Sequence, residues 1–485
     1  MNDLVVVVPG ILGSELWKNN RMLWGFPGGL RELLNFQPGL RRAIDDLMLS
    51  EDPPDQLEID DGVEAPKLLS IPQIISGFMK CDGYDVLRNY LLENFQLYPS
   101  TEEIANYIEF PYDWRRSNRI SAMKLQREVS RRLSIWREET GNDKAKVIYI
   151  CHSMGGLVTR YFLEVLGGWE SCRALISMGT PYRGAVSALN SLVNGYILTG
   201  EDLTEVLRTC TAAYQLLPTY EMIDVGGQKD ARVVEVSLRG IDSTKALDAS
   251  AFHSEIKQEI AARPSNSYPT FYISGVDQCT LQSARLDCGT LEAYENIPGT
   301  WPTHLGTGDG TVPYFSSIPP ELTDDPRGSY TVPAVHAMLP SNIEVLRHVG
   351  TVINRLQDTE IISIQNPDVI DKVVPTSAIQ FGTPAIQLVL QDLYTGATPV
   401  TIKARLLRPR KAITQLQAEI RSATSNNSYT IPMIRSDEDW IGTAYGLPDG
   451  LYYLRVSPEF SRPEDPPSVD DVFEINRTLQ FVTGM

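Results

Sequence analysis

The stretch "VIYICHSMGGLVTRYF", residues 147–162, places a small polar residue on a tight corner between two elements. The apolar run before the corner is typical of a buried strand, and apolar residues at helical spacing follow it. Two glycines stand just beyond Ser153, so neighbouring segments of the chain can approach closely there. The pattern therefore predicts a serine hydroxyl presented at the end of a buried strand.

The window Cys151–Gly155 matches the nucleophile elbow G-x-S-x-G of α/β-hydrolases, with cysteine in place of the first glycine. Cysteine is small enough for that position, and the strand before and the helix after are the context that the motif requires. The alternative is a serine that caps a helix behind a buried strand. We predict that Ser153 is a nucleophile, which needs a base and a group that orients the base.

The chain has five histidines, so the base can be sought by elimination. His152 is adjacent to the serine and faces the wrong way, while His253 and His348 lie in helical patterns. His304 and His336 remain. His336 follows a strand-like run and precedes a helical pattern, which places it at the carboxyl end of a strand, where chemistry collects in α/β sheets. We predict His336 as the base.

Two carboxylates compete for the role of orienting acid. Asp309 lies in the glycine-rich loop "GTGDGTVP", and Asp277 directly follows a strand-like run. An ordinary Asp-Gly turn is the alternative explanation for Asp309. The residues favour Asp309 and keep Asp277 as its rival.

An oxyanion hole needs two backbone N–H donors near the nucleophile. One is the residue after the serine, Met154. The other is expected on the loop after the first strand, where "VVVVPGILGSEL" places Ile11 behind Pro9-Gly10. A simple turn at Pro9-Gly10 is the alternative.

Short apolar runs alternate with amphipathic stretches over residues 1–356, which predicts an α/β sheet. Residues 19–81 and 185–253 interrupt this rhythm and are interpreted as cap or lid insertions. From residue 357 to 485, apolar and polar residues alternate between turn signals, which predicts a small β-sandwich of immunoglobulin type. The predicted strands are Leu4–Val8, Val147–Cys151, Ala174–Met178, Thr270–Ser274 and Tyr330–Val335. The predicted helices are Tyr84–Phe95, Ala122–Thr140, Gly155–Leu166 and Asn342–Leu356, the last with a capping box from Ser341 to Glu344.

The formal net charge of −18 argues against binding to nucleic acid or to an anionic membrane by charge. No signal peptide or membrane-spanning run is seen, so we expect a cytoplasmic protein, with at most peripheral contact to a membrane. Six cysteines in 485 residues do not form a disulfide framework. Cys279 and Cys288 are close enough in sequence to pair, although free buried thiols are the favoured interpretation. No cofactor or metal is expected.

Seven pieces in order extend the match beyond the elbow: "VPGILGSEL", "GYDVLRNYL", "PYDWRRS", "CHSMGGLVTRYFL", "GTPYRGAV", "QLLPTY" and "GDGTVP" followed by "VH". Together they resemble the lecithin:cholesterol acyltransferase family, which includes lysosomal phospholipase A2 and phospholipid:diacylglycerol acyltransferase. The resemblance covers about residues 4–356. It implies an α/β-hydrolase fold, the catalytic residues Ser153, Asp309 and His336, and an oxyanion donor at Ile11.

The resemblance also implies a lipid ester, such as a glycerophospholipid, as the substrate and an acyl-enzyme as the intermediate. A general carboxylesterase or lipase is the first alternative. A non-catalytic protein whose C-terminal sandwich recruits a protein or ligand is the second.

Apolar loops are the candidates for contact with a lipid surface. Leu23, Trp24 and Phe26 are predicted at such an interface, with packing on the core as the alternative. The stretch 189–211, with Leu192 and Tyr196, is either a lid that opens or a fixed cap.

Overall fold

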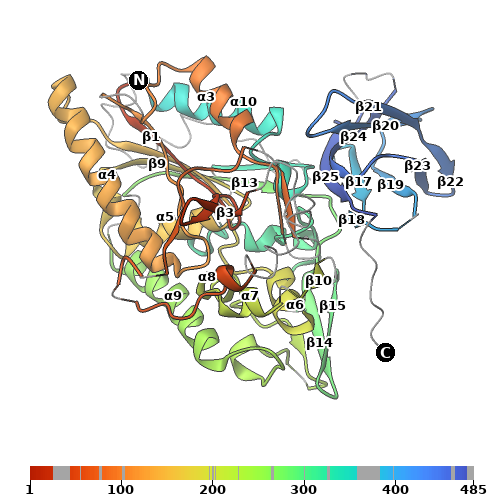
Figure 1. Ribbon diagram of the computed structural model, residues 1–485, viewed down its shortest axis with the longest axis horizontal. Coiled ribbons are helices and arrows are strands. Elements are labelled where there is room, and N and C mark those ends of the chain that lie inside the picture. The colour runs from red at the N-terminus through yellow and green to blue at the C-terminus, as the bar shows by residue number, and fades with distance from the viewer. Residues whose placement is uncertain are drawn as a thin grey trace.

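The centre of the molecule is a parallel sheet of six strands in the order β16-β13-β9-β8-β1-β7 (Figure 1). The strands are β1 (Leu4–Val8), β7 (Tyr107–Glu109), β8 (Val147–His152), β9 (Cys172–Met178), β13 (Thr270–Gly275) and β16 (Ser329–Val332). The structure, a computed structural model, describes residues 1–25, 44–54, 56–59, 61–70, 72–75, 79–100, 104–195, 197–198, 201–202, 204–227, 229–263, 267–299, 301–324, 328–357, 383–396, 398–459, 462 and 465–477.

The central strands are buried along their whole length. Every residue of β1, β8 and β13 is buried, which explains why β1 and β8 are nearly continuous apolar runs rather than alternating ones. The chain passes from β1 to β7 on one side and from β8 to β9 on the other. The carboxyl ends of β1 and β8 therefore flank the switch point of the sheet, where open α/β sheets bind their ligands.

Helices cover both faces of this sheet, with α3 and α10 together on one side and α4 and α5 along the other (Figure 1). Four helices correspond to predicted ones: α3 (Asp85–Asn94), α4 (Asn118–Thr140), α5 (Met154–Glu164) and α10 (Ile343–Leu356). Further helices are α6 (Val186–Asn194), α7 (Thr204–Thr209), α8 (Thr211–Tyr214) and α9 (Ser243–Ala262). The predicted α/β-hydrolase architecture is thus confirmed.

Two details of the predicted elements are wrong. The capping residue of α10 is Asn342, not Ser341, because the Asn342 side chain accepts hydrogen bonds from the N–H groups of Glu344 and Val345 at 3.0 and 3.2 Å. The Ser341 hydroxyl donates instead to the Met338 carbonyl. The strand predicted over Tyr330–Val335 ends at Val332.

Further short strands lie in or beside the interrupting segments and in the hairpin that follows β13. They are β2 (Leu16–Lys18), β3 (Arg21–Trp24), β4 (Val63–Glu64), β5 (Gln73–Ile75), β6 (Met79–Cys81), β10 (Ile197–Leu198), β11 (Glu201–Asp202), β12 (Ile223–Asp224), β14 (Ser283–Asp287) and β15 (Thr290–Tyr294).

The C-terminal β region, residues 383–477, contains two sheets with the orders β17-β19-β23-β22 and β18-β25-β24-β20-β21. Its strands are β17 (Ala385–Val389), β18 (Leu393–Tyr394), β19 (Val400–Leu407), β20 (Leu416–Ser422), β21 (Ser428–Pro432), β22 (Ile434–Ser436), β23 (Asp439–Ala444), β24 (Gly450–Pro458) and β25 (Val469–Ile475). Ile402 and Ala404 from one sheet share a core with Leu416 and Phe473 from the other. The two sheets therefore pack face to face as a sandwich, and the predicted all-β ending is confirmed.

Candidate active site

Ser153 occupies the turn between β8 and α5 in a strained backbone conformation, with φ 51° and ψ −126°. A non-glycine residue persists there only because its surroundings hold it. Two glycines make room for the turn. A Cβ at Gly10 would lie 2.8 Å from the Ser153 Cβ, and one at Gly155 would lie 2.4 Å from the Pro9 carbonyl oxygen. The loop after β1 thus runs directly against the serine.

Cys151 fills the place of the first glycine in the motif. Its side chain is fully buried, and its Sγ lies 3.1 Å from the Thr159 Oγ1 inside α5. Burial raises the pKa of the Cys151 thiol to about 12. Cys151 is therefore an inert packing residue under the turn, not a second nucleophile.

Loops from distant parts of the chain bring an imidazole and a carboxylate to the serine. The His336 Nε2 lies 2.9 Å from the Ser153 Oγ, and the His336 Nδ1 lies 2.7 Å from the Asp309 Oδ2. Since the carboxylate can only accept, Nδ1 carries the hydrogen and Nε2 is free to accept the serine proton. The three side chains form a continuous hydrogen-bonded relay.

The carboxylate of Asp309 is itself held in place. Its Oδ1 accepts the N–H groups of Thr311 and Val312 at 3.0 and 2.7 Å. The backbone adds a direct link, because the His336 N–H donates to the Asp309 carbonyl at 2.8 Å. Asp309 and His336 are therefore tied together by both side chain and main chain.

The predicted oxyanion donors lie beside the serine. Met154 is the first residue of α5, where a helix leaves its N–H without an intrahelical partner. Ile11 lies on the loop that Gly10 brings against Ser153, and Leu12 behind it has a φ of 65°. Within the described part of the chain, no hydrogen bond engages the N–H of either Ile11 or Met154.

A second hydrogen-bond chain connects the parts of the site, and the sequence did not reveal it. The Gly10 N–H donates to the Tyr84 hydroxyl at 2.8 Å, and that oxygen lies 2.9 Å from the His152 Nδ1. The His152 Nε2 lies 3.1 Å from the His336 carbonyl oxygen, so Nε2 carries the hydrogen and Nδ1 accepts from Tyr84. Burial, with a smaller contribution from His336, lowers the pKa of His152 well below its usual range. A neutral His152 therefore links the loop after β1 to the loop that carries His336.

The alternative acid and the other histidines lie away from Ser153 or bond other residues. The Asp277 carboxylate pairs with Arg408 of the C-terminal β region at 2.6 Å. His304 is exposed on a short 3₁₀ turn. His253 and His348 lie in α9 and α10, as predicted, and burial lowers the pKa of each to about 4.

Leu23, Trp24 and Leu192, which were predicted at a lipid interface or in a lid, are buried. Leu23 and Trp24 are buried, and the Trp24 indole N–H donates to the Leu12 carbonyl at 2.8 Å, which favours packing on the core. Leu192 in α6 is fully buried, which favours a fixed cap there. Phe26 and Tyr196 lie outside the described residues.

The described cysteines form no disulfide. Cys279 and Cys288 are both free, and Cys288 is exposed rather than buried. Among the described residues, no cluster of His, Cys, Asp and Glu could hold a metal ion, and no helix is long and apolar enough to cross a bilayer.

The sequence was compared with known families and structures. The family model for lecithin:cholesterol acyltransferase matches residues 95–256. This part of the chain belongs to the lecithin:cholesterol acyltransferase family. The region assigned to the lecithin:cholesterol acyltransferase family contains Ser153 and Met154 and ends before Asp309 and His336, so the match bears on the nucleophile side of the site. The search of curated proteins gave no match.

Among solved structures, the chain is similar to the crystal structure of the Bacillus licheniformis lipase BlEst2 in its propeptide form. The two are 10% identical, the alignment covers 98% of this chain and 93% of that chain, and the TM-score is 0.30. A score of that size is too low to bear on fold or activity. The assignment to the lecithin:cholesterol acyltransferase family therefore rests on residues 95–256 alone.

Proposed function

We propose that the protein is a serine acyl-ester hydrolase or O-acyltransferase that acts on lipid esters. The observation that carries this proposal is the relay from Ser153 through His336 to Asp309, with links of 2.9 and 2.7 Å. The relay lies at the switch point of the sheet, beside two N–H groups that no described residue engages. These are the parts that acyl transfer needs.

Acylation proceeds as follows. His336 Nε2 takes the Ser153 proton while Oγ attacks the ester carbonyl carbon, and the carbonyl oxygen becomes an oxyanion. The N–H groups of Ile11 and Met154 stabilise that oxyanion, a type of contact whose loss typically costs ~10²–10³ in rate. Asp309 stabilises the imidazolium, which then protonates the leaving alkoxide as the C–O bond breaks. An acyl-enzyme and an alcohol result.

Deacylation repeats these steps with a second acceptor. His336 takes a proton from water or from a lipid alcohol, whose oxygen attacks the acyl carbon and releases Ser153. The family match at residues 95–256 supports a lipid ester, and we propose a glycerophospholipid as the acyl donor. Ser153 is only 1% exposed, and we propose that a covering segment moves before a lipid enters. Because Leu23 and Trp24 are buried, peripheral contact with a membrane would require other apolar side chains.

Labelling with a fluorophosphonate tests the nucleophile. We expect covalent labelling at Ser153, confirmed by peptide mass, and none in Ser153→Ala. Ser254→Ala is the matched control, because Ser254 is exposed on α9 and its hydroxyl donates to the Ser250 carbonyl of the same helix. If the wild-type protein is never labelled at Ser153, the proposed chemistry is wrong and a non-catalytic protein is favoured.

Mixing the protein with phosphatidylcholine vesicles and a long-chain alcohol tests the substrate and the acceptor. Lysophospholipid with free fatty acid would indicate hydrolysis, and lysophospholipid with a fatty ester would indicate transfer. If a soluble short-chain ester is cleaved while neither lipid product appears, the general carboxylesterase is the correct alternative.

A further inference from the structure

The C-terminal β region contacts the loops that carry the acid and the base. We name Thr307–Val312 the acid loop and Val335–Met338 the base loop. We propose that the C-terminal β region is a positioning part of the active site, which holds these two loops in register with Ser153. This inference rests on the proposed function, and it assigns the region a role in the reaction rather than in recruiting a partner.

The first contact runs through Gln278 to the acid loop. The Gln278 Nε2 donates to the Ile386 carbonyl at 3.1 Å, and the Leu388 N–H donates to the Gln278 Oε1 at 3.0 Å. Both bonds are buried, so the amide completes the edge of strand β17. The backbone of Gln278 is bonded on its other side, where its N–H donates to the Gly308 carbonyl at 3.0 Å and it forms a bridge with Asp309. One residue therefore joins the C-terminal sheet to the acid.

The second contact is apolar and lies under the base loop. Met338, two residues after His336, forms a buried cluster with Leu451 of β24 and Val472 of β25. Val335, the residue before His336, packs against the same cluster. The base is therefore flanked on both sides by side chains that rest on the C-terminal sheet.

Ion pairs fix the junction around these contacts. The Lys80 ammonium lies 2.8 Å from Asp392 and 2.9 Å from Asp471, and it also donates to the Val472 carbonyl. Burial alone would lower the pKa of Lys80, but the two carboxylates outweigh it and raise the pKa above its usual value. Asp471 is buried, and Lys80 and Asp392 are partly buried, so removing Lys80 would leave two neighbouring carboxylates without their cation.

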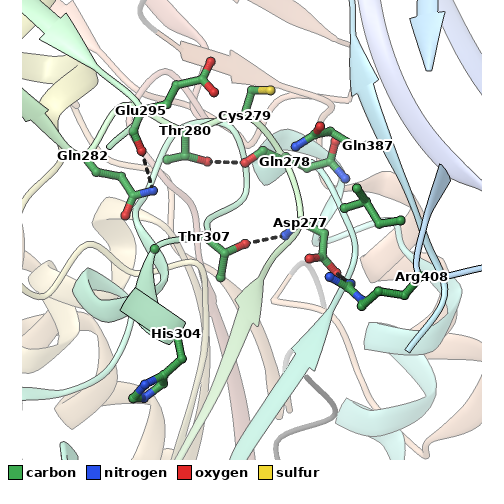
Figure 2. Close-up of a pocket in the computed structure, with 12 residues that line it drawn as sticks. Asp277, Gln278, Cys279, Thr280, Gln282, Glu295, His304, Thr307, Gln387 and Arg408 are labelled. Carbon is green, nitrogen blue, oxygen red and sulfur yellow. Dashed lines mark hydrogen bonds and ion pairs between the residues drawn. The ribbon is translucent and has the colours of Figure 1, made fainter. Parts of the chain in front are cut away.

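Figure 2 shows the same junction from the side of the acid loop, where Asp277 and Gln278 face Arg408 and Gln387. A polar cavity of about 310 Å³ lies between them, and none of the three relay residues lines it. Beside this cavity, the Gln278 hydrogen bonds and the Met338 cluster cover the face of the sandwich that meets the acid and base loops. A partner-recruiting sandwich would not need such a buried face.

Substitutions on the C-terminal side of the junction test the proposal, because those residues do not touch the relay. Leu451→Ala removes the apolar support under the base loop, while Leu451→Met keeps its volume. The matched control is Ile434→Ala on β22, where the side chain is 74% exposed. Each full-length variant is assayed with a soluble short-chain ester for kcat and KM, and with the fluorophosphonate for the rate of labelling at Ser153. Thermal melting confirms that each variant is folded.

We expect Leu451→Ala to lower kcat and the labelling rate at least tenfold, because a catalytic group displaced by an ångström can cost ~10²-fold in rate. KM should change less than threefold, since support for the base affects the reaction and not ester binding. Leu451→Met should recover most of this loss, and Ile434→Ala should match the wild type within twofold. The inference is wrong if folded Leu451→Ala keeps wild-type kcat and labelling, even if it loses activity on vesicles.

If Leu451→Ala does not fold, Gln278→Ala tests the inference instead. The Gln278 side chain bonds only β17, and we expect its removal to lower kcat by the same factor. A wild-type labelling rate in folded Gln278→Ala would then overturn the inference. Labelling of wild-type Ser153 separates this failure from failure of the proposed chemistry. If the wild type is labelled and the junction variants are labelled equally fast, the positioning role alone is wrong.

Discussion

The two sides of the candidate site are built in different ways. Ser153 and Ile11 follow adjacent strands at the centre of the sheet, β8 and β1, and they are held by close backbone packing at Gly10 and Gly155. Asp309 and His336 lie on loops near the edge of the sheet, and side chains outside the sheet support them. A site can therefore combine a rigid nucleophile with a base whose position depends on the rest of the molecule.

The largest expected effect tests the hydrogen-bonded relay from Ser153 through His336 to Asp309. Asp309→Asn should lower kcat by ~10³–10⁴, because the amide cannot hold His336 in the tautomer that accepts the serine proton. Steady-state rates on a soluble ester measure this effect. Asp277→Asn removes the charge of the rival carboxylate and weakens its ion pair with Arg408. This variant should retain at least about a tenth of the wild-type kcat, because a partly exposed ion pair contributes little free energy. If Asp277→Asn lost more activity than Asp309→Asn, Asp277 would be the residue that orients His336.

On the nucleophile side, Gly10→Ala should lower kcat/KM by ~10²–10³, about the loss of one oxyanion donor. The new methyl group would lie 2.8 Å from the Ser153 Cβ, so the loop must retreat and take the Ile11 N–H with it. Gly299→Ala is the control, since a Cβ there meets nothing within 4 Å. A Gly10→Ala enzyme of wild-type activity would exclude Ile11 as a donor.

The sequence predicted the two sides with unequal success, for a physical reason. The strand, the serine and the helix of the elbow are adjacent in the chain, so local patterns were enough to place Ser153 between β8 and α5. The choice between Asp277 and Asp309 was not local, because Asp277 directly follows β13 while Asp309 follows β15 and a 3₁₀ turn. The glycine-rich loop favoured Asp309, and the family resemblance strengthened that choice. The structure joins Asp309 to His336 and Asp277 to Arg408.

The supporting contacts could not be predicted from the sequence at all. Tyr84 and His152 are 68 residues apart, and Gln278 and Ile386 are 108 residues apart. Each is an ordinary residue type in an ordinary pattern, and only the folded chain shows which polar atoms meet. The wrong cap at Ser341 has a related cause, since Ser341 and Asn342 are both good capping residues and packing decides between them.

The chain from Gly10 through Tyr84 to His152 joins the two sides, and Tyr84→Phe breaks it. We expect kcat on the soluble ester to fall roughly tenfold, because a buried Gly10 N–H without a partner costs about 1–3 kcal/mol, part of which is relieved by movement of the loop. His152→Gln should lose less activity than His152→Ala, since its amide can still donate to the His336 carbonyl. Equal losses in the two His152 variants would show that this hydrogen bond does not matter.

The smallest expected effect concerns pH and the base side alone. Asp82 is buried at the junction, with Ser341 and Tyr453 beside it and Asp470 and Arg421 farther off. Burial raises its pKa from 3.8 to about 6, and the two hydroxyls offset only part of that rise. Because the folded state holds the proton more tightly than the unfolded state, Asp82 favours folding below about pH 4 and loses that contribution as the pH rises through 6.

Asp82→Asn should therefore gain stability over the wild type at pH 7.5 by roughly 1–3 kcal/mol, with little or no gain at pH 4. Urea unfolding of both proteins at the two pH values measures the difference, with Asp287→Asn on the exposed hairpin as the control. A gain that is equal at both pH values would mean that the carboxylate is not protonated on folding. A gain confined to pH 7.5 would mean that the junction beside the base loop loses stability as Asp82 becomes charged.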